Sequence, residues 1–213
     1  MSSAPAARQF EVRHLQIARA VAAAIAAAMI TFSPDHSSAF GLSVFSGFAI
    51  LTAIFMFVAA WLVYPAGRRG VAVLLGILDV VAGMVAGVGP LRSDTTFFVL
   101  VAVWAVATGV AEGVSGLRAR RAARTQARDA IFVGALGVVF AIALLCVPAG
   151  YALNYTIEEA HQTFTLTGIT IGVGIFGAYA AIVAVYLGIA GFSPRNTVTA
   201  EPAPADEHFG GAA

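Results

Sequence analysis

The sequence predicts an all-α membrane protein, a polytopic bundle of six transmembrane helices built as three helix-pair repeats. Hydrophobic residues make up 60% of the 213 positions and charged residues only 11%, whereas soluble domains carry about 25% charged residues. The apolar runs are long and lack the two-residue alternation of membrane β-strands. We therefore expect a bundle of helices, which satisfy their own backbone hydrogen bonds in lipid.

Six segments have the roughly 20 apolar residues that a transmembrane helix requires. They are residues 15–33, 39–63, 70–88, 95–117, 130–147 and 166–189. The connections between them are short, so consecutive helices are expected to run antiparallel. The flanking residues 1–14 and 193–213 lack such apolar runs, and we expect them to be disordered ends.

Prolines recur along the chain and divide it into three helix pairs. Pro34, Pro90 and Pro148 each close the first helix of a pair, and the third pair has a longer outer loop, residues 149–165. A cleaved signal peptide at 15–33 is the alternative, because basic residues precede this run and small residues follow it. Cleavage would leave the second helix without its repeat partner, so the repeat favours a retained first helix.

Arginine is concentrated on one side of the predicted membrane. Every arginine except Arg92 lies on the side that holds both chain ends, and by the positive-inside rule that side is cytoplasmic. The chain has no Lys and is rich in Ala and Gly, which indicates GC-rich bacterial coding. The predicted location is therefore the bacterial inner (plasma) membrane, crossed several times, with both termini in the cytoplasm.

The second helix pair carries a recognisable pattern. Its first helix, 70–90, contains spaced glycines and ends at a proline, and its second presents Trp104, Gly109, Glu112 and the arginine-rich exit 118–121. This pattern resembles the HdeD family of bacterial membrane proteins. The resemblance implies a six-helix inner-membrane protein without known enzymatic activity, whose namesake is associated with acid resistance.

Asp79 is the sharpest candidate for a functional residue, and it departs from the family pattern, which is apolar or small at this position. It lies about 13 Å into its helix, near the midplane, where insertion of an Asp costs about 2.5–3.5 kcal/mol. Its helical neighbours are mostly small, so we expect it to point into the bundle. Thr52, Thr108 and Tyr179 lie at similar depth and are the candidate hydrogen-bond donors. Asp79 is interpreted either as a helix-packing residue or as a protonatable relay.

Arg19 and Glu112 are expected to lie about 6–8 Å inside the cytoplasmic boundary. They are candidates for a buried ion pair. A structural pair, or snorkelling of either side chain toward the interface, is the simpler interpretation, and a transport site is the alternative.

Two further groups of residues suit the membrane environment. Close helix packing is predicted for small-xxx-small pairs, namely Gly83 with Gly87, Gly109 with Gly113, and Gly168 with Gly172. Binding to anionic lipid headgroups is predicted for an arginine cluster after the fourth helix, with a cytoplasmic partner as the alternative. The cluster consists of Arg118, Arg120, Arg121, Arg124 and Arg128.

The outer loops hold Glu158, Glu159, His161 and His36. They have ligand chemistry but no metal-binding spacing, so we predict no metal site and interpret them as solvated loop residues. Sensing of external pH is the alternative. No Walker loop, GxSxG elbow or Cys–His pair occurs, so we expect no cofactor and no enzyme activity.

Three functional hypotheses remain open. The first is an HdeD-like membrane protein that supports envelope or acid-stress tolerance. The second is an accessory subunit that docks on a larger membrane complex through its glycine-rich faces, and the third is a small proton-coupled transporter that uses Asp79. The expected partners are the lipid bilayer and a homo-oligomer or larger membrane complex, with no nucleic acid because no soluble domain is present.

Overall fold

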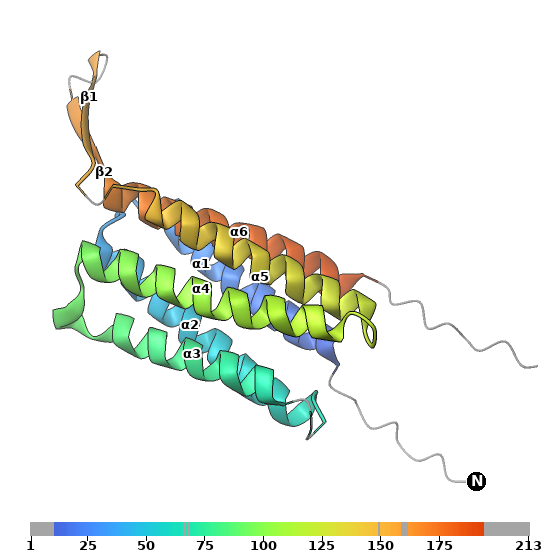
Figure 1. The fold of residues 1–213 in the computed structure, drawn as a ribbon. Coiled ribbons are helices and arrows are strands. Elements are labelled where there is room, and N and C mark those ends of the chain that lie inside the picture. Colours follow the sequence, from blue (N-terminus) through green and yellow to red (C-terminus); the bar gives the residue numbers. More distant parts are fainter. Residues whose placement is uncertain (1–10, 66, 68, 149, 159–161, 194–213) are drawn as a thin grey trace, which may run out of the picture.

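The computed structural model describes residues 11–65, 67, 69–148, 150–158 and 162–193 (Figure 1). Its helices are α1 (Val12–Phe32), α2 (Ser38–Leu62), α3 (Gly70–Gly87), the 3₁₀ turn η2 (Gly89–Leu91), α4 (Asp94–Ala119), α5 (Arg124–Leu145) and α6 (Gly168–Phe192). Each of the six α helices is long and apolar enough to cross a membrane. The predicted all-α polytopic membrane bundle is confirmed.

The six helices form a ring in chain order that closes when α6 packs on α1. The closest interfaces are α2 with α3, α4 with α5, and α6 with α1. The interfaces inside each sequence pair, α1–α2, α3–α4 and α5–α6, are sparser. The tight contacts therefore join neighbouring pairs, and each pair is comparatively loose inside.

The two ends of the ring differ. The described chain starts and finishes at one end, which also carries the α2–α3 and α4–α5 connections and which we call the terminal face (Figure 1). The opposite end, the hairpin face, carries the other connections and a β-hairpin that projects away from the helices. The terminal face is the side that the arginine pattern predicts to be cytoplasmic.

The repeat is visible in which positions are buried. Equivalent inward-facing residues recur on α2, α4 and α6 as triplets: Phe45, Val101 and Phe176; Phe48, Trp104 and Tyr179; Thr52, Thr108 and Val183; Met56, Glu112 and Leu187. On α1, α3 and α5 the corresponding triplets are Arg19, Leu75 and Val133, and Ala23, Asp79 and Gly137; all are buried except Arg19, which is half-buried. Asp79, Arg19 and Glu112 each stand where the other two repeats have an apolar or small residue.

Aromatic side chains from α2, α4 and α6 fill the centre of the ring toward the hairpin face. Phe45 meets Trp104 edge to face with ring centroids 5.0 Å apart, and it meets Phe176 at 5.7 Å. Phe45 and Phe176 are fully buried. This half of the ring is therefore closed by an apolar plug.

Helix boundaries differ from the sequence prediction in one place that matters. The fifth helix begins at Arg124, whereas the sequence places its start at residue 130. Hydropathy marks where a helix becomes apolar, but Arg and Gln are good helix formers and extend α5 beyond the apolar run. The first helix likewise begins at Val12, and most of the predicted disordered ends lie outside the described residues.

The long third outer loop contains an antiparallel hairpin, which the sequence analysis did not predict. Strands β1 (Ala152–Ile157) and β2 (Gln162–Thr167) pair with Asn154 opposite Thr165. The Thr165 hydroxyl donates to the Asn154 side chain at 2.6 Å. Apolar and polar residues alternate along 153–156, and this period-two pattern favours a strand. The sixth helix consequently starts at Gly168, two residues later than predicted, with the Thr167 side chain capping it.

Candidate functional site: a polar cluster inside the helix ring

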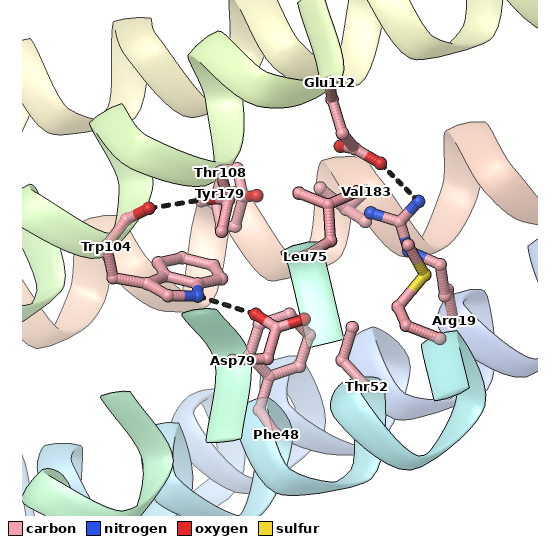
Figure 2. Close-up of a pocket in the computed structure, with 11 residues that line it drawn as sticks. Arg19, Phe48, Thr52, Leu75, Asp79, Trp104, Thr108, Glu112, Tyr179 and Val183 are labelled. Atoms are coloured by element: carbon pink, nitrogen blue, oxygen red, sulfur yellow. Dashed lines mark hydrogen bonds and ion pairs between the residues drawn. The ribbon is translucent and has the colours of Figure 1, made fainter. Parts of the chain in front are cut away.

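Asp79 points into the ring and is held by a tryptophan. The face of α3 that carries Asp79 is buried and consists of Leu75 and small residues such as Gly76 and Ala82. Asp79 itself is only 3% exposed. The indole Nε1 of Trp104 donates to Asp79 Oδ1 at 2.7 Å (Figure 2). A carboxyl at membrane depth therefore receives a hydrogen bond from a neutral donor.

Within the residues that the structure describes, none of the three donors proposed from the sequence donates a hydrogen bond to Asp79. Thr108 donates to the carbonyl of Trp104 one turn earlier, at 2.8 Å. The ring of Tyr179 stacks on Phe140 with centroids 4.4 Å apart. The buried hydroxyl of Thr52 has no hydrogen-bond partner in the described part of the chain. The donor is Trp104, and a buried indole N–H in need of an acceptor was the signal that could have identified it.

Arg19 and Glu112 meet as the sequence suggested. The Arg19 Nη1 atom lies 2.6 Å from Glu112 Oε1, and both side chains are largely buried. This pair joins α1 to α4, helices that are far apart in sequence. It satisfies a positive and a negative charge inside the membrane-spanning region, where either one alone would be costly.

A small cavity connects the two polar pairs. Its volume is about 20 Å³, which is enough for one water molecule. Its walls come from the inward-facing triplets of α2, α4 and α6 together with residues of α1 and α3 (Figure 2). The polar residues that line it are Arg19, Thr52, Asp79, Trp104, Thr108, Glu112 and Tyr179. All six intramembrane candidates from the sequence thus surround one site.

Asp129 is a third buried carboxyl among the described residues, and the sequence did not indicate it. It is 6% exposed and accepts hydrogen bonds from Gln16 Nε2 at 2.7 Å and from the Tyr186 hydroxyl at 3.0 Å. It lies in the part of α5 that precedes the apolar segment, so hydropathy placed it outside the membrane. Its donors come from α1 and α6, and nothing local in the sequence indicates either of them.

Glycines bring the helix backbones together most closely between α4 and α5. A Cβ added at Gly134 would lie 2.5 Å from the Gly109 carbonyl oxygen and 2.5 Å from the Gly113 nitrogen. A Cβ at Gly109 would in turn lie 2.7 Å from the Gly134 oxygen. A Cβ at Gly113 would meet nothing within 4 Å, so a side chain would fit there. Gly113 takes part in the contact through its backbone, which lies close to Gly134.

The other predicted glycine pairs lie at different interfaces. A Cβ at Gly83 would meet Ile50 of α2 at 2.8 Å, and one at Gly87 would lie 3.3 Å from the Ser46 hydroxyl. A Cβ at Gly172 would meet Phe98 of α4 at 2.9 Å. Gly168 is the buried first residue of α6.

The arginine cluster lies on the terminal face, where α4 ends and α5 begins. Arg118 is in the last turn of α4, Arg120 and Arg121 are in the connection, and Arg124 and Arg128 are in the first two turns of α5. All five side chains are exposed. The cluster is positioned to meet lipid headgroups or a partner, and its role stays a prediction.

The acidic and histidine residues of the outer loops do not form a site in the described residues. Glu158 is exposed after β1 and His36 lies half-buried before α2. Glu159 and His161 lie outside the described residues. No group of three or more His, Cys, Asp or Glu side chains in the described ranges is placed to hold a metal ion.

A family model matches the repeated helices. The model, Short repeat of unknown function (DUF308), matches residues 18–88 and again residues 74–146, and together these cover more than half of the chain. The chain belongs to this short-repeat family. The displacement that carries position 18 onto position 74 also carries Phe48 onto Trp104 and Thr52 onto Thr108, so the family's repeat matches the buried triplets. No curated protein and no solved structure matches the chain.

Proposed function

We propose that this short-repeat protein is an HdeD-like, non-enzymatic protein of the bacterial inner membrane that supports tolerance of acid or envelope stress. The observation that carries the proposal is the pair of buried carboxyls, Asp79 and Asp129, whose hydrogen bonds come from uncharged donors. The resemblance of the second helix pair to the HdeD family supports the same role. The proposal puts both termini in the cytoplasm, and the arginine distribution supports this orientation.

Asp79 is the carboxyl at the centre of the bundle that is not paired with a charged group. Glu112 is balanced by the guanidinium of Arg19, and Trp104 supplies Asp79 with a single N–H that carries no charge. A proton taken up by Asp79 would change its hydrogen bonding inside the ring without breaking an ion pair. The bundle can therefore bind protons at its centre and keep its charged pair.

Survival of acid challenge tests the proposal. A deletion strain of the native host should survive low pH less well than the parent, and the wild-type gene should restore survival. Asp79→Asn removes the titratable group and keeps a similar shape, so we expect it to restore survival poorly. Asp94→Asn is the matched control, because Asp94 is exposed at the start of α4. Equal survival of the parent and deletion strains under acid and envelope stress would refute the proposal.

A small proton-coupled transporter is a second candidate, and the wall that two hollows share favours it. The cavity at Asp79 shares Arg19, Leu75 and Glu112 with a much larger crevice that reaches the terminal face. Asp79 would be the proton carrier and Glu112 the gate. In proteoliposomes that contain a pH-sensitive dye, the wild type should move protons and Asp79→Asn should not, whereas Asp94→Asn should behave as the wild type. A wild type without proton flux would exclude this candidate.

The accessory-subunit hypothesis is favoured by the hairpin, which projects from the bundle and exposes Leu153 and Tyr155. A two-stranded hairpin has little stability of its own in water, and a partner would bury it. Purification from the native host in a mild detergent, with the particle mass measured, tests this idea. A stoichiometric partner released by Tyr155→Ser would support it, and a particle with the mass of the chain alone or of its homo-oligomer would contradict it.

A further inference from the structure

A crevice of about 940 Å³ lies between α3 and α4 in the terminal half of the ring. This is within the range of about 300–1,000 Å³ that is usual for ligand sites. Its walls are mainly Ala, Val and Leu side chains; α4 contributes more of the lining than any other helix, and the other five helices also contribute. Leu74 and Val110 line it, and they lie on the same helix faces as Val81 and Val103, which are exposed and lie outside the crevice lining. The crevice is therefore open sideways, at a depth where the surroundings are hydrocarbon.

The crevice lies where one repeat lacks an aromatic side chain. In the third pair, Tyr186 stacks on Phe132 with centroids 3.9 Å apart and fills the space between α5 and α6. In the first pair the position equivalent to Tyr186 is Phe55, which packs against both apolar clusters of the core. In the second pair the equivalent residues are Ala111 and Leu74, and both line the crevice. The second repeat thus leaves open a space that its sister repeats fill.

The charge at the mouth of the crevice is positive. Arg118 lines the opening, and the exposed Arg120 and Arg121 follow in the adjoining connection. Inside, the positive charge of Arg19 is balanced by Glu112, and Asp129 is a carboxyl of the wall whose two oxygens accept hydrogen bonds from Gln16 and Tyr186. The mouth is therefore complementary to an anion and the walls to a hydrocarbon chain.

We propose that the crevice between α3 and α4 binds an anionic phospholipid, with one acyl chain between the helices and the phosphate at Arg118. The lipid enters sideways from the bilayer, and its chain lies against Ala111 where the other repeats have an aromatic ring. This proposal does not depend on the acid-stress role, because it rests on the missing aromatic ring and on Arg118, although Asp129 also lines the crevice.

Native mass spectrometry of the detergent-purified protein, incubated with phosphatidylglycerol, measures the lipid that it retains. The wild type should hold phosphatidylglycerol through detergent removal. Ala111→Phe restores the aromatic of the other repeats and should abolish this retention, and Ala111→Leu should reduce it. Val103→Phe is the matched control, because it adds the same ring to α4 at a position that is 62% exposed and does not line the crevice.

The headgroup is tested by comparing phosphatidylglycerol with phosphatidylcholine that has the same chains. Arg118→Gln should lower the preference for phosphatidylglycerol by about fivefold. Arg120→Gln, outside the crevice lining, should change the preference less. Full retention of phosphatidylglycerol by both Ala111 variants would overturn the proposal. A loss of retention in Val103→Phe equal to that in Ala111→Phe would also overturn it, because it would show that lipid binds only around the outside of the bundle. A lipid-free dimer that Ala111→Phe dissociates would assign the crevice to a second copy of the chain and also overturn it.

Discussion

The two flanks of α4 are packed in opposite ways. Toward α5 the backbones touch, and a Cβ at Gly134 would lie 2.5 Å from the Gly109 carbonyl oxygen. Toward α3, between Ala107 and Ala119, the same helix borders a crevice of about 940 Å³. Both flanks are built from small residues, so composition does not decide which one closes. The α4–α5 interface closes because glycines of the two helices face each other. The α3–α4 interface stays open because a small residue stands where a large side chain would be needed to fill the space.

This difference follows from how the repeat is assembled. Each sequence pair is a loose unit, and the tight interfaces join one pair to the next. A loose interface needs a large side chain to fill it, and Tyr186 does this in the third pair. The second pair has Ala111 at that position and also holds Asp79 and Glu112. The repeat that departs most from its sisters is therefore the one that carries the polar cluster and the crevice.

Removal of one charge of the Arg19–Glu112 pair, which lines the crevice, should have the largest effect on stability. Glu112→Leu makes its triplet fully apolar but leaves the Arg19 guanidinium buried without its carboxylate. We expect the free energy of unfolding to fall by about 3–5 kcal/mol, measured by reversible unfolding in mixed micelles. The double variant Arg19→Leu, Glu112→Leu should recover most of the loss, because an apolar replacement of a whole buried pair is often neutral. A double variant as unstable as the single one would mean that the ion pair itself holds this layer together.

The closed flank should fail when a side chain is forced into it. Gly134→Val places atoms against the backbone of α4, which cannot move aside as a flexible side chain can, so we expect a loss of about 3 kcal/mol, the upper part of the usual range for overpacking. Gly188→Val on α6 is the control, because a Cβ there meets nothing within 4 Å. Thermal unfolding in detergent measures both. Similar melting of the two variants would show that the α4–α5 contact is not a determinant of stability.

The loose interface of the third pair offers a converse test. Tyr186→Phe removes the hydroxyl that donates to Asp129 and should cost about 1 kcal/mol. Tyr186→Ala also removes the stack on Phe132 and should cost about 2 kcal/mol, while it opens between α5 and α6 a space like that beside Ala111. Unfolding in mixed micelles gives the stabilities, and native mass spectrometry should show additional retained lipid for Tyr186→Ala alone. Unchanged lipid retention in Tyr186→Ala would mean that the size of the side chain at this repeat position does not decide whether a lipid-binding space opens.

Much of this arrangement could be predicted from local sequence. Hydropathy and length identify all six helices, and the small face around Asp79 indicates that it points inward. The depths of Arg19 and Glu112 suggest that they could meet. Each of these inferences uses one helix at a time, and the depth of a residue within a helix follows from its position in the sequence.

The remainder depends on which helices are neighbours. The closure of α6 on α1 brings the Gln16 amide and the Tyr186 hydroxyl to Asp129, and neither contact has a local signal. The choice of Trp104 over Thr52 as the donor to Asp79 depends on rotamers and on the space inside the ring. The crevice is visible in sequence only after the repeats are aligned at Phe55, Ala111 and Tyr186, and that alignment requires the register of the buried faces.

The smallest expected effect concerns a single hydrogen bond at another tight interface, α2 with α3. The Ser46 hydroxyl donates to the Gly83 carbonyl at 2.7 Å, across the interface, whereas the Ser43 hydroxyl donates to Ala39 within its own helix. Ser46→Ala should lower the unfolding free energy by about 0.6 kcal/mol, the average for such bonds between membrane helices, and Ser43→Ala should leave it nearly unchanged. Unfolding in mixed micelles distinguishes the two. If close approach of the backbones holds the tight interfaces, Ser46→Ala will lower the unfolding free energy far less than Gly134→Val. A comparable loss in the two variants would mean that hydrogen bonds across the interface, and not glycine contacts, distinguish the closed flanks from the open one.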